Sequence, residues 1–261
     1  MRSAGQNGPA ALAGCVALVT GASSGIGAAT IRRLAAEGAA VALVARRAER
    51  LESLAETVRA GGRNALAIQA DVTNRAEAED AADRAVAELG RLDVVVNTAG
   101  VMLLGPALEA SIDDWERMVA LNVLGTMYVT RAALPHLVRA AEAAPRRVVD
   151  LVNVTSTAGR VARPGAAGYA LTKFGVAAFS ESLRQELIRQ RVRVSVVEPS
   201  TVDTELVSHL SEEQQQAARR QTAAVEPLRP EDIADAISYV VTRSRRVAVN
   251  EILVRAAEQD W

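Results

Sequence analysis

The chain has 261 residues, of which 49% are hydrophobic and only 3% aromatic, and its formal net charge at pH 7 is −1. This length suits one α/β domain with a sizeable core built from Ala, Val and Leu. The near-neutral charge provides no basic excess for binding nucleic acid or an anionic membrane. Cys15 is the only cysteine, so an intramolecular disulfide is excluded and a reducing compartment is indicated.

The N-terminal stretch "MRSAGQNGPAALAG" lacks the apolar segment of a signal peptide, and no apolar run in the chain is long enough to span a bilayer. We therefore expect a cytoplasmic protein. Residues 1–11 are expected to be flexible.

Short β-branched runs alternate with longer Ala/Leu/Arg/Glu-rich stretches. The expected strands are 16–20, 40–45, 65–70, 92–97, 148–155, 192–198 and 250–255, and the expected helices are 28–37, 48–60, 74–89, 111–140, 169–190 and 230–242. Most of the strands are apolar without alternation, which is typical of a parallel sheet covered on both faces. The order predicts an α/β fold: a single doubly wound, Rossmann-type domain over 1–261, with a parallel seven-stranded sheet and helices on both faces.

One segment departs from this alternation. Residues 208–227 are polar and rich in Gln, and they lie between the sixth strand and a helix that begins with proline. A solvated helix is one interpretation, and a substrate loop or lid over 203–227 is the other.

The loop "VTGASSGIG" follows the first strand directly and opens a helix. Glycine lets the chain turn tightly and lets backbone N–H groups approach a pyrophosphate at the positive end of a helix. In this context the loop indicates a dinucleotide site, although an ordinary tight turn has the same composition. The candidate residues are Gly21, Ser23, Ser24, Gly25, Ile26 and Gly27.

The end of the second strand addresses the choice between NAD and NADP. A carboxylate there would bind the ribose 2′-OH, but Ala45 occupies the position and Arg46 and Arg47 follow. Guanidinium groups favour a 2′-phosphate, so the sequence predicts NADP; two solvated arginines are the alternative. Asp71 is a candidate to hold the adenine amino group, or else caps the next helix.

Lys173 is the only lysine in the chain and lies four residues after Tyr169, which places both side chains on one helix face. A phenol ionises near pH ~10, so it is a poor base unless a neighbouring ammonium stabilises its anion. A lysine can also donate to two ribose hydroxyls from one flexible point. The pair predicts an acid/base centre.

Two further polar residues are candidates for this centre. Ser156 follows the fifth strand in "NVTSTAG" and could orient a substrate oxygen, although Thr155 or Thr157 could take that role, and a capping hydroxyl is the plain alternative. Asn122 lies within an expected helix and could bridge Lys173 to water and relay protons, or could be a satisfied core amide.

These residues resemble the short-chain dehydrogenase/reductase family over about residues 12 to 255, through "TGASSGIG", "DV" at 71–72, "NTAG" at 97–100, Asn122, Ser156 and "YALTK". The resemblance implies hydride transfer with Tyr169 as acid/base, Ser156 as substrate orienter, Lys173 as ribose anchor and Asn122 as relay. It adds Val72, Asn97, Ala99, Gly100, Pro199, Ser200, Val202 and Thr204, besides Tyr169 and Lys173, as cofactor contacts. It also implies a homotetramer, or a homodimer, formed through helices at 111–135 and 169–190. A subgroup of bacterial NADP-dependent reductases that includes clavulanic acid dehydrogenase looks similar.

The chain departs from the family pattern at three places. Thr98 stands where an amide normally braces the central strand, and Ser200 replaces the glycine after Pro199. The stretch "RAAEAAPRRVVDL" before the fifth strand is longer than expected.

The predicted function is an NADP(H)-dependent oxidoreductase that reduces an aldehyde or ketone of a small metabolite. An NAD(H)-dependent alcohol dehydrogenase of the same family and a non-catalytic NADP-binding regulatory protein are the alternatives. A methyltransferase that uses S-adenosylmethionine would want an acid after the second strand, where Ala45 stands. His136 and His209 lack metal-ligand spacing, so no metal is expected.

Overall fold

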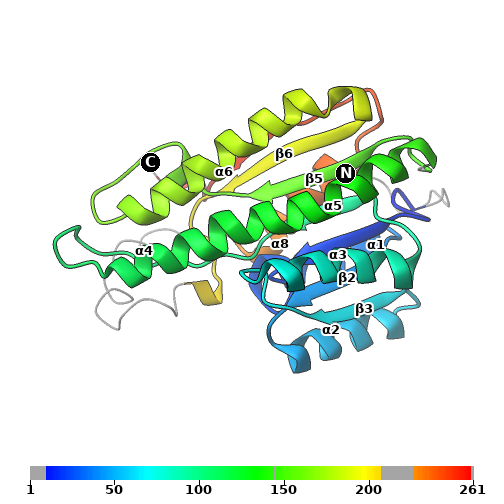
Figure 1. Ribbon diagram of the computed structural model, residues 1–261, viewed down its shortest axis with the longest axis horizontal. Helices are drawn as coiled ribbons and strands as arrows, with labels where there is room; N and C mark the ends of the chain where they lie inside the picture. Colours follow the sequence, from blue (N-terminus) through cyan, green and yellow to red (C-terminus); the bar gives the residue numbers. More distant parts are fainter. Residues whose placement is uncertain (1–9, 144, 207–225, 260–261) are drawn as a thin grey trace.

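The computed structural model describes residues 10–143, 145–206 and 226–259, and the arrangement of their elements is drawn in Figure 1. The strands are β1 (Val16–Thr20), β2 (Ala40–Ala45), β3 (Ala65–Gln69), β4 (Val94–Asn97), β5 (Val149–Val154), β6 (Val192–Pro199) and β7 (Glu251–Val254). The helices are α1 (Gly25–Ala36), α2 (Ala48–Ala60), α3 (Arg75–Leu89), α4 (Ile112–Met118), α5 (Thr126–Ala143), α6 (Ala167–Glu186) and α8 (Pro230–Val241), with a π-helical segment η1 (Val119–Gly125) and two 3₁₀ turns, η2 (Thr157–Gly159) and η3 (Ile188–Gln190).

All seven strands form one parallel sheet in the order β3-β2-β1-β4-β5-β6-β7. The predicted doubly wound α/β fold is confirmed. The order reverses between β1 and β4, which is where such sheets open a crevice at the carboxyl ends of their strands. The first glycine loop leaves β1 at this point.

Helices cover both faces of the sheet. One apolar cluster joins α1, α2 and α8 to one face, and a second joins α3, α5 and the end of α6 to the other. In Figure 1, α3, α5 and α6 cross the face turned toward the viewer. The central strands β1 and β4 are buried along their whole length, because each is paired on both sides and covered on both faces.

The two edge strands are less buried than the strands in the middle of the sheet. Only the first and fourth residues of β3 are buried, and β7 has no fully buried residue among the four. Both are edge strands, so helices cover them less completely. Burial of both faces therefore holds for the middle of the sheet.

The long helix expected over 111–140 is divided into three parts. The α4 and α5 helices flank η1, where the backbone widens to π geometry for one segment. Such π segments occur often at functional sites. This segment contains Asn122, which is one of the candidate catalytic residues.

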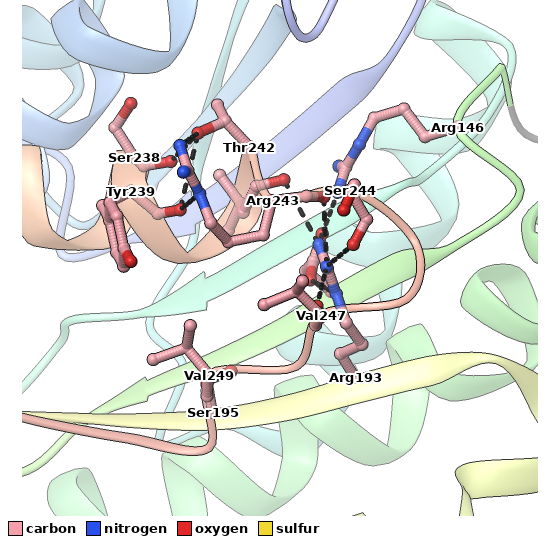
Figure 2. Close-up of polar contacts among 12 residues, drawn as sticks. Arg146, Arg193, Ser195, Ser238, Tyr239, Thr242, Arg243, Ser244, Val247 and Val249 are labelled. Carbon is pink, nitrogen blue, oxygen red and sulfur yellow. Dashed lines mark hydrogen bonds and ion pairs between the residues drawn. The ribbon is translucent and has the colours of Figure 1, made fainter.

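Arg193 on β6 fixes the loop that leads into β7 (Figure 2). Its guanidinium binds both carboxylate oxygens of Asp150 at 2.7 and 3.0 Å and donates to the carbonyl of Val247 at 2.6 Å. Asp150 is fully buried, and Arg146 also donates to it at 2.9 Å. This polar cluster lies at the amino-terminal ends of β5 and β6, opposite the end of the sheet that carries the cleft.

Cys15 is buried at the entry to β1, and burial raises the pKa of its thiol to about 11. Among the described residues, no helix combines the length and apolar character needed to cross a membrane. The flexible start predicted for 1–11 falls almost wholly outside the described residues, and so does most of the lid predicted over 203–227.

Candidate active site

Gly21 and Gly27 show why the loop between β1 and α1 needs glycine. Gly21 has a φ of +66°, and a Cβ on Gly27 would lie 2.4 Å from the Gly21 carbonyl oxygen and 2.7 Å from Thr98 Oγ1. The helix start therefore packs directly on the turn. Backbone N–H groups at this positive helix end could approach a phosphate closely.

The loop forms one side of a cleft of about 370 Å³. Of the predicted cofactor residues, those that line it are Gly21, Ser23, Ser24, Gly25, Ile26, Gly27, Arg46, Arg47, Asp71, Val72, Ala99, Gly100 and Thr204. Asn97, Tyr169, Lys173, Pro199, Ser200 and Val202 are not in this lining. The composition of this lining, with its glycines, its hydrogen-bond donors and its apolar walls, suits a dinucleotide.

Arg47 reaches back across the cleft to the glycine loop. Its Nη2 lies 2.9 Å from Ser23 Oγ and 2.7 Å from Ser24 Oγ, and its Nη1 lies 2.7 Å from Glu205 Oε2. Arg46 lies on the other side, 3.9 Å from Asp71. The Arg47 guanidinium and the hydroxyl groups of Ser23 and Ser24 therefore lie together just beyond the end of β2.

Asp71 does not cap α3, because Asn74 is the capping residue. The Asp71 carboxylate accepts hydrogen bonds from the backbone N–H and hydroxyl of Thr73 at 3.0 and 2.8 Å. These bonds fix its direction at the lip of the cleft.

Asn97 was predicted to contact the cofactor, but its side chain points into the protein. It is buried, and its amide donates to Asn153 Oδ1 at 2.9 Å and to Thr130 Oγ1 at 3.2 Å. Thr98, the departure from the family pattern, does brace a central strand: its hydroxyl donates to the Thr20 carbonyl at 2.5 Å.

Tyr169, Lys173 and Ser156 come together at the end of the sheet. Tyr169 and Lys173 are both buried on one face of α6, and the Lys173 Nζ lies 5.6 Å from the centre of the Tyr169 ring. A hydrogen bond from Ser156 lowers the Tyr169 pKa, although burial, the larger effect, raises it to about 12. Lys173 Nζ donates to the Val154 carbonyl at 3.2 Å, so β5 holds the ammonium in place.

The expected acidification of the phenol by Lys173 is not found in the protein chain alone. Burial lowers the Lys173 pKa to about 8 and raises that of Tyr169. Both shifts have one cause, because a low-dielectric site disfavours the charged form of each group. The protein therefore holds Tyr169 as a proton donor.

Asn122 is a buried amide whose hydrogen bonds are satisfied, which was the second of its two interpretations. Its Oδ1 accepts from the Val101 N–H at 2.8 Å, and its Nδ2 donates to the Val101 carbonyl at 2.9 Å and to Thr172 Oγ1 at 3.1 Å. The side chain thus ties the loop after β4 to α6. A Cβ on Gly100 would lie 3.3 Å from Asn122 Oδ1 and 3.9 Å from Lys173 Nζ, so this loop connects the cleft to the catalytic candidates.

The end of β6 is shaped by Ser200. Its hydroxyl accepts from the Ala256 N–H at 3.0 Å, and its own N–H donates to the Val254 carbonyl at 2.9 Å. The side chain that replaces glycine is therefore directed at the C-terminal segment. Val202 forms an isolated bridge with Leu228.

Sequence reasoning missed several residues of the cleft, namely Val44, Ala70, Leu121, Glu205 and Leu206. It discussed Ala45 and Thr98 but did not predict them as cofactor contacts. Most are apolar walls without a chemical signature. The acidic Glu205 could have been suspected only from its place after Thr204. Among the described residues, no cluster of side chains has the composition of a metal site.

Residues 15–215 match the family model described as short chain dehydrogenase. The chain belongs to the short-chain dehydrogenase family. It is 37% identical over 248 residues to glycine betaine reductase ATRR of Emericella nidulans, covering 95% of this chain but 19% of that protein. The activity of that much longer protein is therefore no guide to the substrate here.

Two solved structures of this family carry bound cofactors. Serine dehydrogenase in its closed form with NADP+ has a TM-score of 0.85 and 35% identity, covering 94% of this chain and 96% of that one. A 3-ketoacyl-(acyl-carrier-protein) reductase from Brucella melitensis with NADH has a TM-score of 0.84 and 29% identity, covering 94% and 98%. One similar structure therefore contains NADP+ and another contains NADH. The narrower resemblance to clavulanic acid dehydrogenase stays a prediction.

Proposed function

We propose that this short-chain dehydrogenase is an NADP(H)-dependent reductase of an aldehyde or ketone carried by a small metabolite. The single observation that supports this most is a buried phenol that is hydrogen-bonded to Ser156 and whose ring centre lies 5.6 Å from the Lys173 Nζ. Lys173 in turn lies close to Gly100, which lines the cleft. A phenol whose pKa is about 12 is a proton donor at neutral pH. That state suits reduction, in which the carbonyl oxygen must take up a proton.

In this proposal each side chain has one task. The nicotinamide, when bound, supplies the hydride to the carbonyl carbon. Tyr169 donates its proton to the carbonyl oxygen, and Ser156 hydrogen-bonds that oxygen as negative charge develops on it. Lys173 binds the ribose hydroxyls and stabilises the phenolate that remains, and Asn122 holds the loop that separates the cofactor from α6.

The preference for NADP rests on charge. Ala45 ends β2 without a carboxylate, and Arg47 with Ser23 and Ser24 offers a cationic donor set next to it. An NADH-dependent enzyme is the second candidate, because one solved relative holds NADH.

We also propose a homotetramer in the cytoplasm. The lone thiol suits a reducing compartment. Leu124, Met127, Leu171 and Phe174 are exposed apolar residues on η1, α5 and α6, which are the helices expected to form the interface.

The deciding experiment mixes the purified protein with NADPH and a panel of aldehydes and ketones and follows the nicotinamide absorbance. Tyr169→Phe should abolish turnover and leave NADPH affinity unchanged, because it removes the phenolic hydroxyl that supplies the proton and keeps the ring. Turnover by Tyr169→Phe at the wild-type rate would refute the assignment of the acid, and failure of the wild-type protein to oxidise NADPH with any carbonyl would refute the function.

A further inference from the structure

A buried carboxylate lies next to the proposed catalytic centre and has no task in the chemistry above. Glu198 is 3% exposed near the end of β6, one residue before Pro199. Burial raises its pKa, and the guanidinium of Arg160 opposes that shift. Burying an ionised carboxylate costs desolvation free energy unless a nearby cation offsets it. The cation that pairs with Glu198 therefore indicates what the carboxylate does.

The partner of Glu198 is Arg160, which forms ion pairs with side chains on both β6 and β7. Arg160 Nε lies 2.5 Å from Glu198 Oε2, and Arg160 Nη2 lies 2.5 Å from Glu251 Oε2 on β7. The two carboxylates differ in environment, since the side chain of Glu251 is 59% exposed. Water screens the outer pair, so the buried pair with Glu198 is the stronger contact.

Ser156 and Arg160 lie at the two ends of the same short turn, η2, as its N-cap and C-cap residues. Ser156 caps η2 by accepting a hydrogen bond from the Ala158 N–H at 3.1 Å, and the Gly159 N–H returns to the Ser156 carbonyl at 2.8 Å. The Arg160 N–H donates to the Thr157 carbonyl at 3.0 Å. A displacement of Arg160 is therefore transmitted through a tight turn to the serine.

The other side of this turn is pressed against α6. A Cβ on Gly159 would lie 3.1 Å from the Lys173 carbonyl oxygen. The turn is thus held between the backbone of the helix that carries Tyr169 and the sheet that carries Glu198. Its position decides how the Ser156 hydroxyl meets the phenol.

We propose that Arg160 and Glu198 form a positioning clamp that sets the Ser156 hydroxyl against Tyr169, an inference that rests on the proposed function. Arg160 is a positioning residue, because it acts on the reaction through Ser156. Glu198 anchors the guanidinium in the sheet, and Glu251 contributes only from the surface.

The test uses Arg160→Gln in the full chain, assayed with NADPH and a carbonyl that the wild-type protein reduces. We expect kcat to fall on the order of tenfold to a hundredfold, as misplacement by about 1 Å can produce, with an NADPH dissociation constant within about twofold of wild type. Loss of the Ser156 hydrogen bond should also raise the Tyr169 pKa, so the alkaline limb of kcat should move to higher pH. Lys173 is the charged neighbour of Tyr169 on α6, and it is unchanged in this variant.

Three companion variants make the result specific. Arg160→Lys keeps the cation beside Glu198 and should recover most of kcat, and Glu198→Gln should reproduce the Arg160→Gln defect. Glu251→Gln removes the exposed carboxylate and should change kcat less than about threefold. Thermal unfolding of each variant separates a local displacement from loss of the fold.

The clamp is overturned if Arg160→Gln keeps the wild-type kcat and pH profile, or if Glu251→Gln is as impaired as Glu198→Gln. An Arg160→Lys variant as inactive as Arg160→Gln would also overturn it. These outcomes require an active wild-type enzyme, whereas failure of the proposed function appears as a wild-type protein that oxidises NADPH with none of the carbonyls.

Discussion

At the scale of single residues, the proposal of a reductase depends on the environment of the buried pair on α6. Lys173 and Tyr169 are both desolvated, with pKa values of about 8 and about 12. The phenol is therefore fully protonated at neutral pH, while the ammonium lies close to its own titration. A tyrosine in this state can donate a proton at once, and the cation beside it then limits the cost of the anion.

Cofactor choice is also decided by individual side chains. Arg47→Ala should lower the preference for NADPH over NADH by about ten- to a hundredfold, because it removes charge-assisted hydrogen bonds from the position next to Ser23 and Ser24. The measurement is kcat/KM with each cofactor.

Arg50→Ala is the matched control for that change. Arg50 pairs with Glu205, as Arg47 does, but is absent from the cleft lining. An unchanged NADPH/NADH ratio in Arg47→Ala, or an equal loss in Arg50→Ala, would contradict the assignment.

At the scale of elements, Gly27 lets the start of α1 pack directly against the glycine loop. This packing shapes the side of the cleft where we expect the cofactor phosphates to bind. Gly27→Ala would place a methyl group 2.4 Å from the Gly21 carbonyl oxygen, so the loop must move. We expect NADPH binding to become undetectable in a fluorescence titration while the far-ultraviolet circular dichroism spectrum stays native.

A glycine in α6, Gly168, serves as a control for the general effect of steric crowding on the protein. Gly168→Ala would crowd Trp115 and Met118, at 2.7 and 2.8 Å, outside the cleft lining. It should lower the thermal unfolding temperature and keep NADPH binding. Wild-type affinity in Gly27→Ala would show that the loop tolerates a side chain.

At the scale of the whole molecule, the ion pair between Asp150 and Arg193 joins β5 to β6, and Arg193 also holds the loop before β7. Figure 2 shows Arg193 beside Val247 of that loop. Arg193→Met leaves the buried Asp150 carboxylate with Arg146 as its one remaining ion-pair partner among the described residues, and it should cost about 3–5 kcal/mol of unfolding free energy. Urea denaturation measures it. Arg75→Gln, which breaks the exposed pair with Glu79, should produce no resolvable change. Equal midpoints for wild type and Arg193→Met would contradict the prediction.

The assembly is a second property of the whole molecule. Replacing both Leu171 and Phe174 by Glu should shift the protein from a tetramer to smaller species in size-exclusion chromatography with light scattering, because charge is placed on the expected interface. Leu108→Glu, at an exposed site outside both expected interface ranges, should leave the mass unchanged. A wild-type monomer would rule out the proposed tetramer.

The sequence by itself determined the fold and singled out the candidate catalytic groups. Apolar strand runs, the spacing of glycines in 21–27 and the four-residue separation of Tyr169 from Lys173 are local patterns, and local patterns are legible without coordinates. They placed every strand of the sheet to within two residues at either end and put the glycine loop at the crevice.

Only the tertiary structure decided how those groups behave. The direction of the Tyr169 pKa depends on burial by residues distant in the sequence, and the inward turn of Asn97 depends on Asn153 across the sheet. The contact of Arg160 with Glu198 joins residues 38 positions apart. Desolvation and long-range pairing have no signature in a linear pattern, because both are created when the chain closes on itself.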